Sequence, residues 1–119
     1  MNQLSNHDHS RFLTRTNRKT GRLHTSGTFE ADTGINLGIM KEAITFQMTW
    51  PGAPTIYYGD EIGMTGWTDP DNRRPFRWED MNEDILSYHK CLINIRHSRK
   101  IFKSGSLDYL YMGYGLICY

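Results

Sequence analysis

The sequence predicts the end of an α/β domain that continues into an all-β region. An apolar helical pattern at Thr33–Thr49 is followed, after a very short loop, by an apolar strand pattern at Thr55–Tyr58. This order is the αβ half of a βαβ unit. A polar and aromatic loop, Asp60–Trp78, comes next, at the position where α/β folds build their sites. Apolar and polar residues then alternate at Leu107–Tyr111, which is the period of a strand.

The composition restricts the classes of protein that the chain can represent. It has 119 residues, 38% of them hydrophobic and 23% charged, as in an ordinary soluble domain. A formal net charge of +1 provides no global field to attract nucleic acid or an anionic membrane. No apolar run approaches the roughly 20 residues that cross a bilayer, and the N-terminus carries no signal-peptide pattern. We therefore expect no nucleic-acid partner and no membrane partner.

The first third of the chain predicts a short strand and then a long loop. Met1–Ser5 looks like the end of a strand and Gly115–Tyr119 like a strand cut short, so we expect a fragment of a longer protein. Basic residues recur from Arg11 to Arg22 without any acid, which predicts a solvated loop that continues through Asp32. A nucleic-acid arm is the alternative, although the aromatic residues of a single-strand platform are missing. A connection this long tends to be functional or mobile.

The clearest helix is predicted at Thr33–Thr49. Its apolar residues form a broad surface, which suits a helix packed on a sheet. Thr33 or Asn36 can cap its N-terminus. Pro51 prevents its continuation and disfavours a helical conformation for Trp50.

A second helix is predicted at Glu83–Lys100, where apolar residues recur at helical spacing. Asp80 or Asn82 can cap it. Gly105 breaks the pattern, and after the alternating segment two glycines mark a tight turn before a return strand at Leu116–Tyr119. The two cysteines of the chain lie in these apolar segments, so we expect buried free thiols; a disulfide, the alternative, has no support from spacing. They are Cys91 and Cys118.

Candidate site residues first appear directly after the first strand, in Asn6–His9. A carboxylate such as Asp8 accepts hydrogen bonds from sugar hydroxyls, and His7 can donate one. Asp8 could instead cap a turn, and His7 could be a satisfied structural histidine. A metal site of His7, Asp8 and His9 is a third reading, but no further ligand stands at a suitable spacing.

Two further groups of charged residues follow the second strand. Asp60 and Glu61 are neighbours at a strand end and point to opposite faces, so they cannot flank one bond; the structural reading is favoured. An alternating cluster of acids and arginines between Gly66 and Pro75 can bind hydroxyls, with tryptophan faces for sugar rings. A loop held by its own ion pairs explains the cluster equally well. The cluster comprises Asp69, Asp71, Arg73 and Arg74, with Trp67 and Trp78 beside it.

Three motifs make the sequence similar to a known family. NHDHSRFL at Asn6–Leu13 resembles the fourth conserved region of glycoside hydrolase family 13, the α-amylase family. PGAPTIYYGDEIGM at Pro51–Met64 resembles the motif of that family around the eighth barrel strand. DPDNRRPFRW at Asp69–Trp78 resembles the loop that follows in neopullulanases, cyclomaltodextrinases, maltogenic amylases and oligo-α-glucosidases. The three motifs in this order are highly specific, and the resemblance extends over essentially the whole chain, including Ile95–Leu107.

The resemblance implies the C-terminal part of a (β/α)8 barrel. This chain would supply the seventh and eighth strands with their helices in residues 1–102. Residues 103–119 would begin a C-terminal all-β sandwich domain. A barrel of about 250 residues cannot close with less than half its length, so we expect the isolated chain to be poorly stable, with exposed sheet edges, and to need the rest of the barrel.

The same resemblance implies a retaining α-glucan hydrolase acting on α-1,4 or α-1,6 bonds of maltooligosaccharides, cyclodextrins or pullulan. Asp8 would match the third family carboxylate, which binds hydroxyls of the cleaved ring as the oxocarbenium-like state forms, and His7 the histidine beside it. Asp69 and Arg73 would match residues that hold the sugar on the non-reducing side; Arg74 is a weaker match. A transglycosylase of the same family and a non-catalytic carbohydrate-binding fragment are the alternatives.

The nucleophile and acid/base motifs of the family do not occur in these residues, so we expect the isolated chain to be inactive. No cofactor is implied for this stretch; calcium is a candidate for the rest of the enzyme. The expected partner is an α-linked glucan or oligosaccharide. For the whole protein a homodimer is one option, and a bacterial cytoplasmic location is the favoured expectation.

Overall fold

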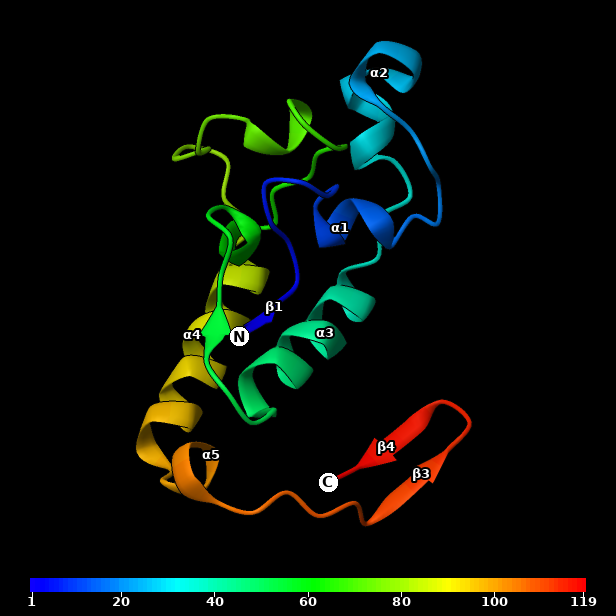
Figure 1. Cartoon of the computed structure of the whole chain (residues 1–119). Coiled ribbons are helices and arrows are strands. Elements are labelled where there is room, and N and C mark those ends of the chain that lie inside the picture. The colour runs from blue at the N-terminus through cyan, green and yellow to red at the C-terminus, as the bar shows by residue number, and fades with distance from the viewer.

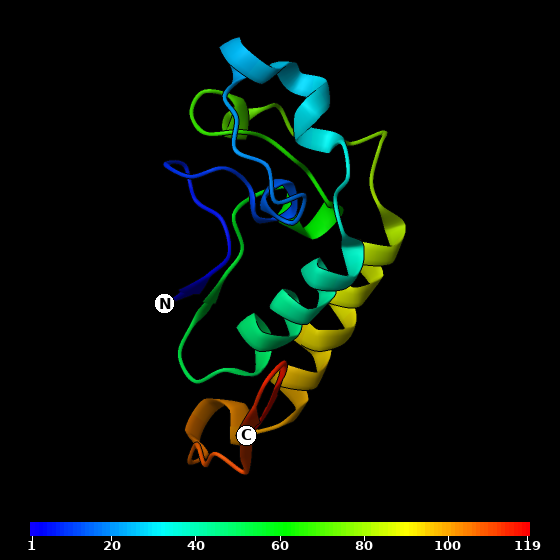
Figure 2. The ribbon, with the colours of Figure 1, turned by 90° about the vertical axis from the view of Figure 1, so that its right-hand side faces the viewer.

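Two long helices, α3 (Leu37–Thr49) and α4 (Glu83–Ser98), pack against each other along the molecule. The computed structural model describes all 119 residues, and Figure 1 shows loops and short helices at one end and a β-hairpin at the other. Figure 2 shows the two long helices side by side. The buried core between them and the short helix after the first strand comprises Leu13, Met40, Ile44, Met48 and Ile85.

Helix α3 ends at Thr49, as predicted, but begins at Leu37 rather than at Thr33, because Asn36 is the cap. The Asn36 side chain accepts a hydrogen bond of 3.0 Å from the Ile39 N–H, which caps the first turn. The alternative cap, Thr33, instead donates its hydroxyl to the Phe29 carbonyl. Trp50 is extended, with φ −64° and ψ 144°, as expected for a residue before proline.

Helix α4 is capped by Asn82, whose side chain accepts from the Ile85 N–H at 3.0 Å. Near its other end, Arg96 is buried and donates to the carbonyls of Met48 at 2.6 Å and Trp50 at 3.3 Å. The guanidinium therefore joins the end of α4 to the turn after α3. A short helix, α5 (Ile101–Ser104), follows before the chain crosses to the hairpin.

The sheet beside the helices is one parallel pair, β1 (Asn2–Gln3) with β2 (Pro54–Thr55). Gln47 of α3 joins the strands to the helix, because its side-chain amide donates to the carbonyls of Asn2 at 3.1 Å and Thr55 at 2.7 Å. The predicted strand Thr55–Tyr58 was therefore too long. A strand is defined by its ladder bonds, and residues 56–58 make none.

The predicted loop between Arg11 and Asp32 was wrong, because it contains helices α1 (Phe12–Arg15) and α2 (Leu23–Asp32). Neither has the apolar period that identifies a helix from sequence, and α2 bends at Gly27, where φ is +67°. Distant polar contacts hold them instead. The Asn17 amide, for example, donates to the carbonyls of Glu30 at 3.3 Å and Thr33 at 3.2 Å.

The predicted hairpin is confirmed as β3 (Tyr111–Gly113) paired with β4 (Leu116–Cys118). Gly115 takes the left-handed conformation that the tight turn requires, with φ +75°. The first strand begins at Tyr111, later than the alternation from Leu107 predicted. The Tyr119 ring packs edge-on against Trp50, with centroids 5.3 Å apart, which joins the hairpin to the end of α3.

The prediction of buried thiols was wrong. Both cysteines are free, but Cys91 is exposed on the outer face of α4 and Cys118 is partly buried. The helical period places Ile85 and His89 of the same helix against the core and leaves position 91 outside. None of the helices has the length and apolar character needed to cross a membrane.

Candidate functional site

The first part of the candidate site is the turn Asn6–His9, which follows β1. The Asn6 side-chain oxygen accepts hydrogen bonds from the backbone N–H groups of Asp8 at 2.9 Å and His9 at 3.1 Å. This Asx arrangement holds the backbone of the turn. His7 and Asp8 are mostly exposed and lie 3.4 Å apart, from Nε2 to Oδ1. The turn therefore presents a carboxylate and an imidazole together to solvent.

The second part is the loop that passes through the short helices η1 (Asp60–Ile62) and η2 (Asp71–Arg73). Arg73 Nε lies 2.5 Å from the Asp69 carboxylate, and both side chains are about half exposed. The Arg73 guanidinium also donates to the His7 carbonyl at 3.4 Å. The structure thus brings all four predicted site residues to one surface, although their roles remain predictions.

Asn72 joins the two parts, and sequence reasoning missed it. This side chain is fully buried in η2, and its amide nitrogen lies within hydrogen-bond distance of three carbonyl oxygens of the Asn6–His9 turn. Its position inside the third motif was visible in the sequence. The partners were not, because they lie more than 60 positions earlier in the chain.

Arg11 and Asp60 form a buried ion pair below the turn. Arg11 is completely buried, and its Nη1 donates to the Asp60 carboxylate at 3.0 Å and to the Tyr58 carbonyl at 2.7 Å. Its guanidinium also lies over the Tyr57 ring, 4.6 Å from the centroid. The prediction of a solvated basic loop therefore fails at Arg11, whose partners come from a distant segment.

The environment of Asp60 decides its role. Burial raises the pKa of this carboxyl from 3.8 to about 6, although Ser5 and the Arg11 guanidinium pull it down. Glu61 is also engaged, since its side chain accepts from the Gly59 N–H at 2.7 Å. Both carboxylates make internal contacts, which agrees with the structural reading of this pair.

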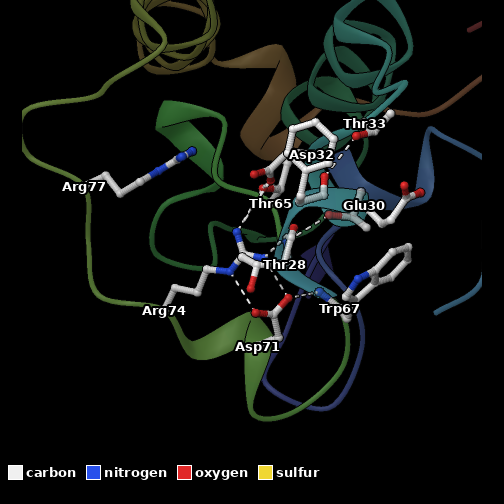
Figure 3. A network of polar contacts seen from close by, with 12 residues as sticks. Thr28, Glu30, Asp32, Thr33, Thr65, Trp67, Asp71, Arg74 and Arg77 are labelled. Carbon is white, nitrogen blue, oxygen red and sulfur yellow. Dashed lines mark hydrogen bonds and ion pairs between the residues drawn. The ribbon is translucent and has the colours of Figure 1, made fainter. Parts of the chain in front are cut away.

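A polar network centred on Arg74 holds the second loop against α2 (Figure 3). Arg74 donates to both oxygens of Asp71, Nε at 2.9 Å and Nη2 at 2.7 Å, and its Nη1 lies 3.5 Å from Asp32. Burial alone lowers the pKa of Arg74, but these two carboxylates raise it above its ordinary value. Asp71 and Arg74 therefore form an ion pair with each other. This agrees with the interpretation in which the loop is held by its own ion pairs.

The two tryptophans of this loop have different environments. Trp67 is buried and donates its indole N–H to the Gly27 carbonyl at 3.0 Å, so of the two readings left open for this loop, the one in which the Trp67 face meets a sugar is contradicted. The cause is again a distant segment, α2, which covers the ring. Trp78 is 74% exposed and packs against Phe76, with ring centroids 4.5 Å apart. Its indole face remains available to a ligand.

The exposed side chains of the candidate site are mainly charged and polar. No group of three or more His, Cys, Asp or Glu side chains lies in an arrangement that could hold a metal. The reading of His7, Asp8 and His9 as three ligands therefore has no geometric support. What the surface offers is carboxylate oxygens together with guanidinium and imidazole donors, which can form hydrogen bonds with a polar ligand.

Comparisons with known proteins identify relatives over most of the chain. The family model "Alpha amylase, catalytic domain" matches residues 1–102. Neopullulanase 2 of Thermoactinomyces vulgaris is 43% identical over 108 residues, which cover 89% of this chain and 16% of that protein. An amylopullulanase of Thermoanaerobacter thermohydrosulfuricus is 38% identical over 111 residues, covering 93% of this chain and 7% of the relative.

Solved structures also match this chain over nearly its whole length. An α-amylase of Anoxybacillus superposes with a TM-score of 0.77 at 29% identity, covering 97% of this chain and 22% of that one. The debranching enzyme of Nostoc punctiforme gives a TM-score of 0.71 at 33% identity, with 92% and 19% covered. The chain thus spans less than a fifth of the length of the curated relatives named here, 7% and 16%.

Proposed function

This chain belongs to the α-amylase catalytic-domain family, whose members are glycoside hydrolases of family 13, and its fold is part of their barrel. From that membership, we propose that the whole protein is a retaining hydrolase of α-glucosidic bonds. Relatives named neopullulanase, cyclomaltodextrinase and amylopullulanase support α-glucans, such as pullulan and cyclodextrins, as its substrates. In this proposal β1 and β2 are the seventh and eighth barrel strands, and residues 103–119 begin a β domain.

The observation that carries the proposal is the position of the Asp8 carboxylate. It is exposed, it stands on a turn whose backbone is hydrogen-bonded by Asn6, and Arg73 of the Asp69–Arg73 pair donates to the backbone carbonyl of the adjacent His7. A carboxylate held this way can accept hydrogen bonds from two hydroxyls of one sugar ring. Those bonds strengthen as the ring flattens and gains positive charge, so Asp8 contributes mainly in the transition state. His7 adds a donor on the same side.

The Asp69–Arg73 pair is proposed to bind the neighbouring sugar. Its carboxylate and guanidinium provide acceptors and donors for hydroxyls, and the contact of Arg73 with the His7 carbonyl keeps the two sugar-binding regions adjacent. These contacts form equally with substrate and transition state, so they affect binding. The nucleophile and the acid/base residue, and any calcium site, belong to the remainder of the barrel in this proposal.

The first test replaces Asp8 by Asn in the whole protein. We expect kcat on maltotriose or a cyclodextrin to fall by roughly 100-fold or more, about 3 kcal/mol, because the amide cannot match the developing positive charge. Asp84→Asn is the matched control, since Asp84 is an exposed carboxylate on α4, paired with Lys41. A kcat close to that of the unmodified protein would refute the assignment. Longer oligosaccharides among the products would identify transglycosylation.

The second test replaces Arg73 by Ala. We expect KM to rise by roughly tenfold with kcat little changed, because uniform binding of a neighbouring sugar is lost. Arg22→Ala, an exposed arginine in the basic run, provides the control and should leave both constants unchanged. An unchanged KM in the Arg73 variant would remove this residue from the site.

A further inference from the structure

We propose that Asn72 is a positioning residue for Asp8: its buried amide holds the Asn6–His9 turn in the shape that presents the carboxylate. The inference rests on the proposed function, because Asp8 must act on the substrate for its position to matter. Asn72 itself does not touch the surface that would meet a sugar, since its side chain is completely buried.

The first step is the geometry of the amide. Asn72 Nδ2 lies 2.8 Å from the His9 carbonyl oxygen, 2.9 Å from that of His7 and 3.3 Å from that of Asn6. An amide oxygen in the same place would repel three carbonyl oxygens, so the nitrogen must face the turn. Its two hydrogens serve the two short contacts and share the longer one.

The second step is the division of the turn's backbone groups between two asparagines. Asn6 accepts from the N–H groups of Asp8 and His9, as described above, and Asn72 donates to the carbonyls of the same turn. The two asparagines therefore bind both N–H donors and carbonyl acceptors of the backbone around Asp8. The His7–Asp8 contact, between two exposed side chains, cannot replace such a constraint.

The third step is that Asn72 is itself held in a fixed place. Gly66 lies so close to η2 that an added Cβ would stand 2.6 Å from the Asp71 carbonyl oxygen and 3.0 Å from Asn72 Cα. The Trp67 N–H donates to the Asp71 carboxylate at 2.8 Å. Because Gly66 also bonds through its carbonyl to the Arg11 N–H, at 2.9 Å, η2 is fixed to the segment that leaves the turn.

The short helix η2 therefore determines the positions of two proposed substrate-binding groups. Asn72 positions Asp8, and the next residue, Arg73, stands beside the proposed neighbouring sugar. A variant that removes the Asn72 amide without disturbing η2 should displace Asp8 while leaving Arg73 in place. The expected signature, with rates expressed per folded enzyme so that loss of folded protein is not counted, is a fall in kcat with little change in KM.

The test uses the whole protein with Asn72→Leu, which keeps the shape of the side chain and removes its donors. We expect kcat to fall by roughly tenfold or more and KM to stay within about threefold. Asn17→Leu is the matched control, because the Asn17 amide also joins two backbone carbonyls, those of Glu30 and Thr33, away from the turn. That variant should lower the melting temperature and leave kcat unchanged.

A double variant tests whether Asn72 acts through Asp8. If it does, Asp8→Asn with Asn72→Leu should be no slower than Asp8→Asn alone, so the two effects are not additive. If Asn72→Leu does not fold, Asn72→Ser replaces it with the same expectation, since serine is small and cannot reach the turn.

The outcomes separate this inference from the proposed function. A near-normal kcat in Asp8→Asn would refute the proposed function and this inference with it. Loss of activity in Asp8→Asn together with unchanged kcat in the folded Asn72 variant would overturn the inference alone. Additive losses in the double variant would also overturn it, because Asn72 would then act by another route.

Discussion

The loops that follow β1 and β2 and the C-terminal hairpin both lie outside the core between the long helices. Different kinds of contact hold them in place. In the loops, buried polar side chains bond to distant segments, as Arg11 does to Asp60 and Asn72 to the Asn6–His9 turn. The hairpin instead meets the helices through aromatic contacts of Tyr119 and leaves its apolar side chains exposed. At least half exposed are Leu110, Tyr111, Met112, Tyr114, Leu116 and Ile117.

The difference shows what each kind of contact can specify. Hydrogen bonds are directional, and a buried one is expensive to leave unmade, so the loop network holds the proposed sugar-binding groups in one arrangement. The hairpin is positioned instead by aromatic packing of Tyr119 against Trp50 and by an exposed hydroxyl contact between Tyr119 and Thr49, rather than by buried hydrogen bonds. The candidate site therefore depends on a rigid polar interior, and the hairpin contributes nothing to it. Three predictions test this comparison.

The largest effect is expected from breaking the buried ion pair. Arg11→Met should lower the free energy of unfolding of the whole protein by about 3 kcal/mol or more, because Asp60 would be left buried without its cation. Chemical denaturation monitored by tryptophan fluorescence measures the change. Arg18→Met, an exposed arginine of the same basic run, should change stability by less than about 0.5 kcal/mol. Similar losses of unfolding free energy in both variants would mean that the buried Arg11–Asp60 pair contributes no more to stability than an exposed arginine does.

A pH dependence should come from Asp60. Its pKa is raised from 3.8 to about 6 in the folded protein, so folding favours the neutral form. The contribution of neutral Asp60 to the free energy of unfolding is therefore fully present below about pH 4 and is lost as the pH rises through about 6. The total loss is at most about 3 kcal/mol. Unfolding free energies measured across this range should show the loss in the unmodified protein and a flatter profile in Asp60→Asn. The same slope in both would assign the effect to another group.

The smallest effect is expected in the hairpin. Tyr114 is fully exposed at the turn, so Tyr114→Ser should alter the free energy of unfolding by less than about 0.5 kcal/mol and leave kcat unchanged. Denaturation and steady-state kinetics of the whole protein provide the measurement. A loss above about 1 kcal/mol would break the comparison, since it would show that another part of the whole protein covers this face.

Sequence patterns succeeded where a signal is local. The end of α3 and the start of α4 follow from Pro51 and Asn82, and Asn36 was one of the two caps considered for α3; each acts on backbone groups within a few residues. The hairpin was likewise readable from alternation and a glycine turn. Within the candidate site, the side chains of His7 and Asp8 could be selected because of their chemistry and their motif, before any geometry was known.

The failures have one physical cause. Helices α1 and α2 lack an apolar period, and Arg11 and Trp67 looked like surface residues, because the contacts that bury or order them come from distant parts of the chain. Such contacts leave no periodic trace in the local sequence. Polar residues that are buried by distant partners are therefore the ones that sequence reasoning placed on the surface.

By itself, the sequence determined the two long helices, the family and the motif that carries Asp8, since capping, periodicity and motif order are properties of neighbouring residues. Only the tertiary structure showed that Asn72 contacts the turn at His7, which lies 65 positions earlier in the chain. It alone also showed that Arg11 is buried against Asp60. Hydrogen bonds join atoms that are close in space, and only the folded chain establishes which distant atoms those are.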